Sequence, residues 1–429
     1  MTLSPDRLAT GIVRRTDEAP RRVDADLCVV GSGAAGMSAA LEAAKLGASV
    51  AMIEAGPALG GQSVGALIGT FCGLYGNGPD PKLVTHGIAG AILADLGASG
   101  DLAPIDKRRN TRIVLYRVNA LARWFERRAH DAKLRVALGA VVRGVRVEGK
   151  RIAGIDVATR FGDLDIRAKS YVDASGDANL FWLAGAECRV PETPIFGTGM
   201  FTLEGVADGY DREAIVAALE KKADAWGLRR RDGFVFGSTA SPAGETLVNM
   251  THAATPLDPF DAAQAMLDGR EQVDRVVDFF KAEFPAHFKD ARVKVYGLPG
   301  VRQTRWIKGA HHLTADEVRQ GVRFPDAVAR CSWPIELHDR PEGVHWEVFG
   351  DDHMHYVPFR SMVAPGIDNL VAAGRNVDGD PAALSSIRVM GPCIAMGAAA
   401  AHALDLAGAG SVHQLDIGAL GKRLAANLD

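Results

Sequence analysis

Apolar and polar positions alternate or recur along the chain in an order that predicts strands and helices. An apolar run at 27–30 is followed by a glycine-rich turn, an Ala-rich segment and a second apolar run at 49–53. From 134 to 166, short segments alternate between apolar and polar residues, which predicts a half-buried antiparallel meander. Apolar residues recur at helical spacing over about 115–132 and about 259–284, which predicts amphipathic helices. This order of elements predicts an α/β protein.

The turn after the first predicted strand has the spacing of a dinucleotide-binding fingerprint. Gly31, Gly33 and Gly36 form the pattern GxGxxG, and Glu54 ends the second strand about 20 residues later. In such a unit the glycines permit a tight turn, a close approach to a pyrophosphate and close packing of helix on strand, while the acid accepts ribose hydroxyls. The unit predicts a Rossmann-like domain that binds an adenine dinucleotide. The alternative is a glycine-rich turn in an ordinary βαβ unit.

Composition and charge narrow the class of protein. The chain has 429 residues, 47% of them hydrophobic, and a formal net charge of -3, so we expect roughly two or three lobes and no nucleic acid as a partner. No apolar run of about 18 residues occurs, which predicts no membrane span. The cysteines are scattered, without a CxxC pair or metal-ligand spacing, so we expect reduced thiols, a cytoplasmic location and no metal. They are Cys28, Cys72, Cys188, Cys331 and Cys393.

Further motifs resemble those of a known family. They are a second glycine pair at 60–61, the turn 173–177, and the segments 300–305, 369–375 and 386–390. Together with the opening fingerprint, these motifs resemble the bacterial FAD-dependent oxidoreductases with a glutathione-reductase-like flavin fold. The matches are spread over about 25–405, nearly the whole chain. The resemblance implies FAD as the cofactor, and it is a poor guide to the substrate.

The resemblance also implies which residues bind FAD. The glycine turn would hold the pyrophosphate, and Glu54 would bind the adenosine ribose. The full implied set is Gly31, Gly33, Ala35, Gly36, Glu54, Gly61, Gln62, Ser63, Val142, Gly176, Gly374, Arg388 and Met390. No His or Cys stands in a recognised attachment pattern, so we expect noncovalent binding, with Cys72 as the position to examine.

The segment between the two flavin-like portions lacks a dinucleotide pattern. We therefore interpret 185–358 as an α+β substrate or cap domain inserted into the Rossmann-like FAD-binding domain. The flavin domain would then comprise 25–184 and 359–429, and 1–24 would form an N-terminal arm. Ligand sites prefer domain interfaces, so we expect the active site where the cap rejoins the flavin domain.

Histidines and arginines gather late in the predicted cap. Our candidates for catalysis are His312 and His355, as acid or base, and Arg302 and Arg360, as clamps for a substrate carboxylate. The alternatives are structural histidines and surface salt bridges. His353 and His355 would share one face of a strand, but two ligands alone do not make a metal site.

These observations predict a FAD-dependent oxidoreductase, a dehydrogenase or reductase. It would transfer a hydride between flavin and a small organic substrate, with a carboxylate as one candidate group on that substrate. A flavin-carrying electron-transfer subunit of a larger complex is the alternative, and a flavoprotein whose FAD is purely structural is a third. The electron acceptor is not predicted, and homo-oligomer formation stays open.

Overall fold

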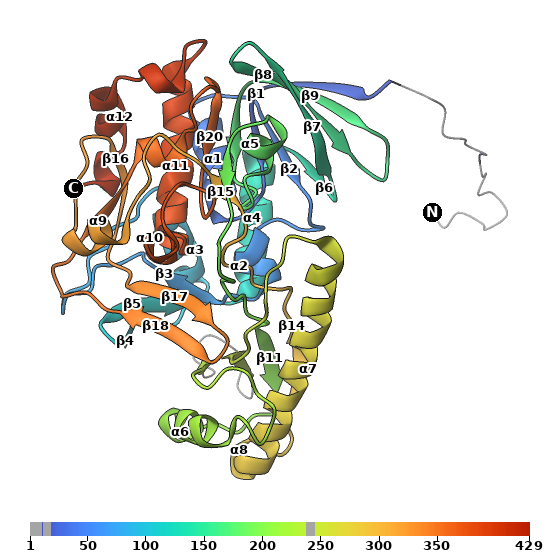
Figure 1. The fold of residues 1–429 in the computed structure, drawn as a ribbon, viewed down its shortest axis with the longest axis vertical. Coiled ribbons are helices and arrows are strands. Elements are labelled where there is room, and N and C mark those ends of the chain that lie inside the picture. The colour runs from blue at the N-terminus through green and yellow to red at the C-terminus, as the bar shows by residue number, and fades with distance from the viewer. Residues whose placement is uncertain (1–10, 12–18, 237–244) are drawn as a thin grey trace.

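A seven-stranded sheet lies in the upper part of the molecule as it is drawn in Figure 1. The computed structural model describes residues 11, 19–236 and 245–429. Strand order is β6-β2-β1-β9-β8-β7, with β20 also pairing with β9. The strands are β1 (Arg21–Val30), β2 (Val50–Glu54), β6 (Arg135–Leu138), β7 (Val141–Glu148), β8 (Arg151–Ala158), β9 (Leu164–Asp173) and β20 (Leu370–Ala372).

Parallel and antiparallel pairing meet in β9. Its last residues pair in parallel with β20 and with the end of β1, whereas Leu164 to Ile166 pair antiparallel with β8. The predicted meander is correct for β7, β8 and β9 and wrong for its first segment, because β6 lies parallel beside β2. Alternation along a short strand reports which face is buried and does not distinguish a parallel from an antiparallel neighbour.

Two helices pack closely against each other beside the parallel part of the sheet. They are α1 (Ala34–Lys45) and α11 (Met390–Ala407). A Cβ placed on Gly397 of α11 would lie 2.1 Å from the backbone oxygen of Ala35 in α1, so only glycine permits this approach. Among the described helices, α11 alone is long and apolar enough to cross a membrane, yet 78% of it is buried inside the protein, as in a core helix.

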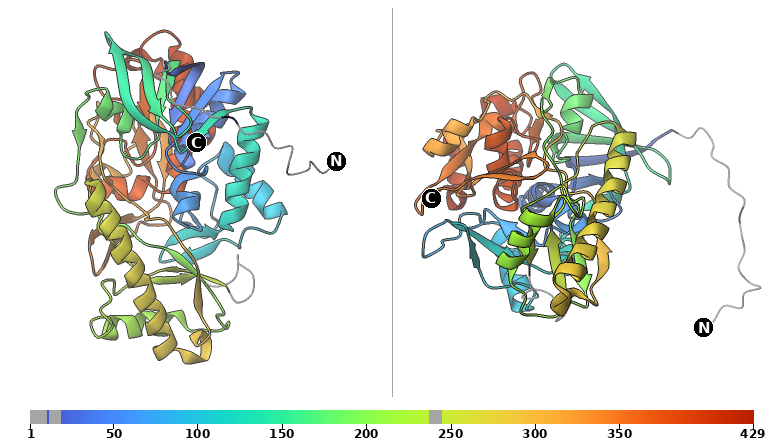
Figure 2. Two further views of the ribbon diagram at one scale, coloured as in Figure 1. Left: turned by 90° about the vertical axis from the view of Figure 1, so that its right-hand side faces the viewer. Right: turned by 60° about the horizontal axis from the view of Figure 1, so that its bottom comes forward.

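A second lobe has its own sheet and core. Its sheet runs in the order β12-β13-β11-β14, and the long helix α7 packs against β14 (Figures 1 and 2). The buried apolar residues of this lobe fall between Phe201 and Ala291. Its elements are β11 (Phe201–Glu204), α6 (Arg212–Lys222), β12 (Phe234–Phe236), β13 (Thr246–Asn249), α7 (Pro259–Glu283), α8 (Pro285–Phe288) and β14 (Arg292–Tyr296).

The chain then returns to the first core well before residue 358. Trp306, Leu313 and Val357 are buried in the same cluster as the central sheet. The elements of this return are β15 (Trp306–Ile307), α9 (Ala315–Gln320), β16 (Ala327–Cys331), β17 (Ile335–Arg340), β18 (Gly343–Glu347) and β19 (His355–Pro358). The four-part division of the chain stays a prediction; the second core itself uses a shorter segment than 185–358.

The remaining elements complete the first lobe. Strand β5 lies between β3 and β4 in a small sheet, and β10 pairs with β15. The remaining elements are α2 (Gly61–Gly65), β3 (Thr70–Cys72), α3 (Ile88–Ala98), β4 (Asp106–Arg108), β5 (Thr111–Leu115), α4 (Val118–Asp131), α5 (Asn179–Leu183), β10 (Cys188–Arg189), α10 (Pro381–Ile387), α12 (Ile417–Arg423) and the 3-10 turns η3 (Phe359–Met362), η4 (Val412–Gln414) and η5 (Ala425–Asn427). The helices predicted over 115–132 and 259–284 are confirmed as α4 and α7.

Candidate functional site

The three fingerprint glycines occupy different environments at the end of β1. Gly31 has a φ of 95°, and a Cβ on it would lie 2.3 Å from the backbone oxygen of Ala174. A Cβ on Gly36 would lie 1.9 Å from the backbone oxygen of Gly31. Gly33 differs, because an added Cβ there would meet no atom within 4 Å. Two glycines are therefore required by packing, and the third leaves open space at the N-terminus of α1.

Other predicted cofactor residues gather around the same helix end. A Cβ on Gly61 would lie 2.8 Å from the Cα of Gly33, and one on Gly374 would lie 3.3 Å from the Cβ of Ala35. Both glycines have positive φ values, of 50° and 105° respectively. Tertiary folding thus brings three segments, far apart in the sequence, to the start of α1.

Glu54 is held at the end of β2 by the glycine turn. Its Oε2 accepts hydrogen bonds from the backbone N (2.8 Å) and the Oγ (2.6 Å) of Ser32, and its Oε1 accepts from the backbone N of Gly56 (2.7 Å). These bonds orient the carboxylate beside the fingerprint, as a ribose acceptor requires.

The other implied cofactor residues lie in varied settings. Ser63 donates its hydroxyl to the backbone oxygen of Gly60 (2.5 Å), and a Cβ on Gly176 would lie 2.6 Å from the Nε of Arg375. Val142 is half-buried in β7, Gln62 is half-buried in α2, and Met390 is the first residue of α11. Their roles in binding stay predictions.

Asp177 ties the predicted turn 173–177 to two later segments. Its Oδ1 accepts a hydrogen bond from Arg375 Nη2 (2.8 Å) and one from the hydroxyl of Thr304. Burial alone would raise the pKa of Asp177, but the charge of Arg375 and these hydrogen bonds hold the pKa below its usual value. The ionised carboxylate therefore joins β9 to the segments around 304 and 375.

The four predicted catalytic residues do not share one hydrogen-bonded cluster. Arg360 pairs with Asp326 (3.0 Å) and its side chain is 51% exposed, whereas His312 Nδ1 lies 2.8 Å from Asp378 Oδ1. The segment between Arg302 and β20 crosses different parts of the molecule, and each of these side chains meets different neighbours there. Closeness in sequence therefore did not bring the four side chains together. Arg302 belongs to the polar network described below.

His355 lies in a buried network of its own. Its Nδ1 is 3.1 Å from Nε2 of His353, and its Nε2 is 2.9 Å from the Oγ of Ser386. Burial lowers the pKa of His355 to about 3. The histidine is thus neutral near neutral pH and holds β19 against α10. In the part of the chain that is described, no group of three His, Cys, Asp or Glu side chains is placed to hold a metal ion.

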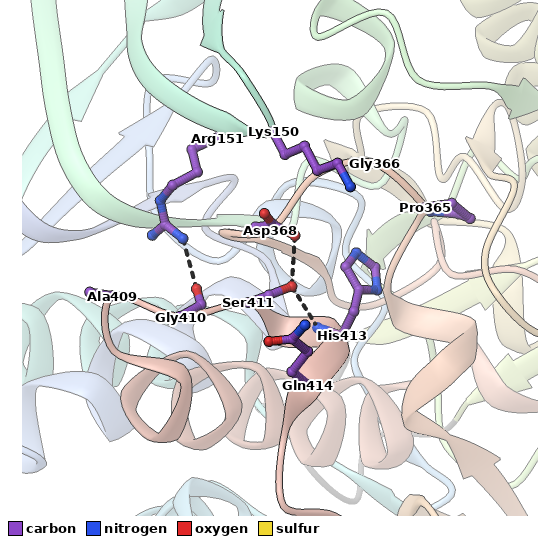
Figure 3. Close-up of a pocket in the computed structure, with 10 residues that line it drawn as sticks. All are labelled: Lys150, Arg151, Pro365, Gly366, Asp368, Ala409, Gly410, Ser411, His413 and Gln414. Carbon is purple, nitrogen blue, oxygen red and sulfur yellow. Dashed lines mark hydrogen bonds between the residues drawn. The ribbon is translucent and has the colours of Figure 1, made fainter.

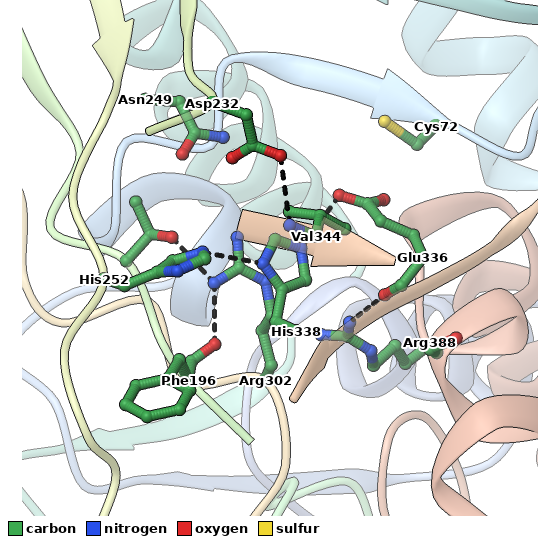
Figure 4. A network of polar contacts seen from close by, with 12 residues as sticks. Cys72, Phe196, Asp232, Asn249, His252, Arg302, Glu336, His338, Val344 and Arg388 are labelled. Carbon is green, nitrogen blue, oxygen red and sulfur yellow. Dashed lines mark hydrogen bonds and ion pairs between the residues drawn. The ribbon is translucent and has the colours of Figure 1, made fainter. Parts of the chain in front are cut away.

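Arg302 lies inside a polar network between the two lobes (Figure 4). Its Nη1 donates to the backbone oxygen of Phe196 (2.8 Å) and to Thr198 Oγ1 (2.7 Å), which are its only acceptors among the described residues. Burial and the neighbouring charge of Arg388 lower the pKa of Arg302 well below its usual value. The guanidinium keeps further donors for another group.

Strand β17 contributes two side chains to this network that we did not choose from the sequence. Glu336 Oε1 lies 3.0 Å from Nε2 of His338, and His338 Nδ1 lies 2.9 Å from Nε2 of His252. Arg388 Nη2 donates to the backbone oxygen of Glu336 (3.0 Å). Glu336 and His338 are two residues apart, which places both side chains on one face of a strand. This spacing is the sequence pattern from which the pair could have been predicted.

The network adjoins the glycine turn through the start of α11. Arg388 precedes that helix, and its backbone oxygen accepts a hydrogen bond from Cys393 Sγ (3.1 Å). A Cβ on Gly374, beside Ala35 of α1, would lie 4.0 Å from the same sulfur. Cys72 lies near Glu336, and burial, followed by the charge of the Glu336 carboxylate, raises the pKa of the Cys72 thiol.

A profile of the family described as FAD dependent oxidoreductase matches residues 26–424. The chain belongs to this family. No curated protein matches it. The protein binds FAD, and the parallel sheet with α1 at the end of β1 is its Rossmann-like flavin fold. The glycine turn fits the cofactor, since the open space at Gly33 adjoins the unpaired N–H groups and positive dipole of α1.

Several solved structures resemble the chain at low identity. A geranylgeranyl bacteriochlorophyll reductase-like protein from Thermoplasma acidophilum is 17% identical, with a TM-score of 0.46, over 90% of this chain and 78% of that one. A flavin-dependent brominase is 16% identical, with a TM-score of 0.49, over 94% and 83% of the two chains. An L-amino acid deaminase from Proteus vulgaris is 12% identical, with a TM-score of 0.42, over 92% of each.

A surface pocket of about 560 Å³ lies elsewhere, at the turn between β7 and β8 and the segment after α11 (Figure 3). Two pairs of its polar groups are bonded to each other: Arg151 Nη1 donates to the backbone oxygen of Gly410 (2.7 Å), and Ser411 Oγ donates to Asp368 Oδ1 (2.6 Å). None of its lining residues belongs to the glycine turn or to the Arg302 network. We therefore assign it no part in the flavin site.

Proposed function

We propose that this oxidoreductase transfers a hydride between FAD and a small organic substrate, and that Arg302 and Arg388 bind an anionic group of that substrate. The observation that carries the proposal is the placement of two half-buried guanidinium groups within electrostatic reach of each other. Arg388 lies directly before α11, and each of the two has donors that no described residue accepts. A planar guanidinium suits a carboxylate because it presents paired N–H donors.

Orphaned polar atoms support a ligand at this position. Arg388 Nε is buried without a hydrogen-bond partner, and both side-chain amide atoms of Gln303 are buried without one among the described residues. Buried polar groups are nearly always hydrogen-bonded in folded proteins. A bound substrate and cofactor would supply the missing partners.

The chain's own contribution is binding and electrostatics. FAD, when bound, exchanges an electron pair and a proton with the substrate as a hydride. The N-terminus of α11 adjoins Gly374 and places a positive dipole end where negative charge develops on reduction. Arg302 and Arg388 would orient the substrate by its anionic group. We leave Arg360 outside this group because Asp326 already binds it at the surface.

An anaerobic screen tests the proposal. Small carboxylates and matched neutral analogues are mixed with the holoprotein, and the flavin absorbance is followed. We expect at least one carboxylate to bleach the flavin, and we expect Arg302→Gln to raise its half-saturating concentration while FAD content stays constant. Bleaching only by a partner protein would instead favour the electron-transfer subunit. Equal bleaching by neutral analogues would contradict an anion-binding role.

A further inference from the structure

A third apolar cluster lies where the two lobes meet. It joins Phe236 and Leu247, on strands β12 and β13 of the second lobe, to side chains of the first lobe that include Cys331 and Trp333. Some of its members are only half-buried, so part of each side chain stays exposed. They are Leu67, Ile68, Cys72, Trp346 and Val389. The cluster therefore presents an apolar surface at the junction of the lobes.

This apolar surface borders Arg388. Val389 follows that arginine directly in the chain. Trp346 pairs with Glu336 across strands β18 and β17, and the backbone oxygen of Glu336 accepts the hydrogen bond from Arg388 Nη2 (3.0 Å). An anionic group bound by Arg388 would therefore have apolar side chains beside it.

The same surface reaches towards Arg302 through the turn after α2. Ala66 and Leu67 form this turn, and a Cβ placed on Gly300 would lie 3.7 Å from the Cβ of Ala66. The backbone N of Gly300 donates to the backbone oxygen of Thr198 (2.8 Å), and Thr198 Oγ1 accepts from Arg302 Nη1 (2.7 Å). Leu67 thus adjoins one arginine segment through Ala66 and the other through the apolar cluster.

Leu67 has a backbone conformation that leucine rarely adopts. Its φ is 53°, and it stands just after α2, where its backbone N donates to the backbone oxygen of Val64 (3.1 Å). Glycine or asparagine takes this left-handed position with less strain, because a larger side chain crowds the backbone there. Strained positions gather at ligand sites, where the side chain itself is needed. The conformation of Leu67 therefore favours a function for its side chain.

We propose that the substrate carries an apolar body beside its anionic group, as aryl and branched alkyl carboxylates do, and that Leu67 determines this specificity. The inference rests on the proposed function and names its substrate class. Arg302 and Arg388 would bind the carboxylate, while Leu67 and Val389 would contact the carbon skeleton. A polyhydroxylated acid would place hydroxyl groups against these apolar side chains without hydrogen-bond partners, and it would bind more weakly.

Calorimetric titration of the holoprotein without oxygen tests the substrate class and needs no turnover. The ligands are phenylacetate, isocaproate and gluconate. We expect the two apolar acids to bind at least about 10-fold more tightly than gluconate, since a small apolar contact commonly contributes that much. Equal affinities for the three acids would overturn the inference and leave the anion site of the proposed function standing.

The neutral analogue phenylacetamide separates a failure of the proposed function from a failure of the inference. We expect it to bind more weakly than phenylacetate, because the amide carries no charge for Arg302 and Arg388. Equal binding of the amide and the acid, or no binding of any acid, would contradict the proposed function and the inference with it.

A substitution that relieves the strain tests Leu67 itself. Asparagine tolerates the left-handed conformation and removes the apolar contact. We expect Leu67→Asn to reduce the preference for phenylacetate over gluconate by about 10-fold at unchanged FAD content. Leu67→Gly also fits this backbone and decides the question if Leu67→Asn loses FAD. An unchanged preference would overturn the role of Leu67, whatever the melting temperature of the variant.

Two controls show whether the effect comes from the side chain of Leu67. Lys133 occupies the same position after α4, with a φ of 53° and its N bonded to the backbone oxygen of His130 (2.9 Å), but its side chain is exposed. Lys133→Asn should leave the preference unchanged. Leu67→Met keeps an apolar side chain of similar volume and should retain the preference. Loss of the preference in either control would refute the assignment to Leu67.

Discussion

Arg388 and Glu336 are joined by a hydrogen bond of 3.0 Å, from Nη2 of the arginine to the backbone oxygen of the glutamate. Arg388 lies just before α11, which packs in the flavin fold, and Glu336 lies in strand β17. The bond therefore connects the flavin fold to the polar network that contains Arg302 and His338. Burial lowers the pKa of Arg388 to about 10. The guanidinium remains charged at neutral pH and is the link between cofactor frame and candidate substrate site.

Substitution of Gly33 should abolish FAD binding without unfolding the protein. Gly33→Val adds a side chain where no protein atom lies within 4 Å, so the fold has room for it while the pyrophosphate loses its approach to the backbone. We expect purified protein with a normal far-ultraviolet spectrum and little flavin absorbance. Gly90→Val, at another open glycine in α3, is the matched control and should retain FAD. Full FAD occupancy in Gly33→Val would contradict the assignment.

The cofactor should be bound without a covalent bond. Burial and the Glu336 carboxylate raise the pKa of the Cys72 thiol, which makes it a poor nucleophile at neutral pH. Acid precipitation should therefore release the yellow chromophore into the supernatant. Colour that stays with the precipitated protein would show the expectation to be wrong, and Cys72→Ser would then test that sulfur as the attachment point.

Two arginines that looked alike in the sequence should behave differently. We expect Arg302→Gln to slow flavin reduction by substrate roughly 100-fold or more, because a half-buried guanidinium with spare donors is lost. Arg360→Gln removes a half-exposed ion pair with Asp326 and should change the rate little. Rapid-mixing measurements at equal FAD content compare the variants. Equal rates for the two variants, or a larger loss in Arg360→Gln, would refute this ranking.

The buried His355 should make the protein less stable in acid. Its pKa is lowered from about 6.5 to about 3, so between these values the unfolded chain takes up a proton that the folded chain refuses. Stability therefore falls as pH decreases through this window, by about 1.4 kcal/mol per pH unit for one such group.

Melting temperatures measured between pH 6.5 and 4.5 check this effect. His355→Gln should show a shallower decline than the unsubstituted protein, because glutamine keeps hydrogen-bonding capacity and does not titrate. His130→Gln is the control, since that side chain is 90% exposed, and its decline should match the unsubstituted protein. An unchanged slope in His355→Gln would show that this histidine is not the source.

Much of the cofactor frame was predictable because it depends on local backbone geometry. Gly31 has a positive φ, and Gly36 packs against the backbone oxygen of Gly31. Both requirements for glycine therefore arise within one segment of six residues. Helices α4 and α7 were predicted for the same reason, since helical spacing is a local property. Strand β6 was assigned the wrong pairing because the identity of a strand's neighbour is not local.

The amino-acid sequence by itself determined the dinucleotide turn, the family and FAD as the cofactor, because short contiguous segments carry those requirements. Only the tertiary structure decided which polar side chains meet. His252 and His338 come from distant segments, and their hydrogen bond depends on how the second lobe packs against β17. Arg360 and His312 have equally suitable chemistry, but nearby carboxylates bind them elsewhere. The sequence determines which functional group each side chain carries, whereas long-range packing determines which other groups that side chain contacts.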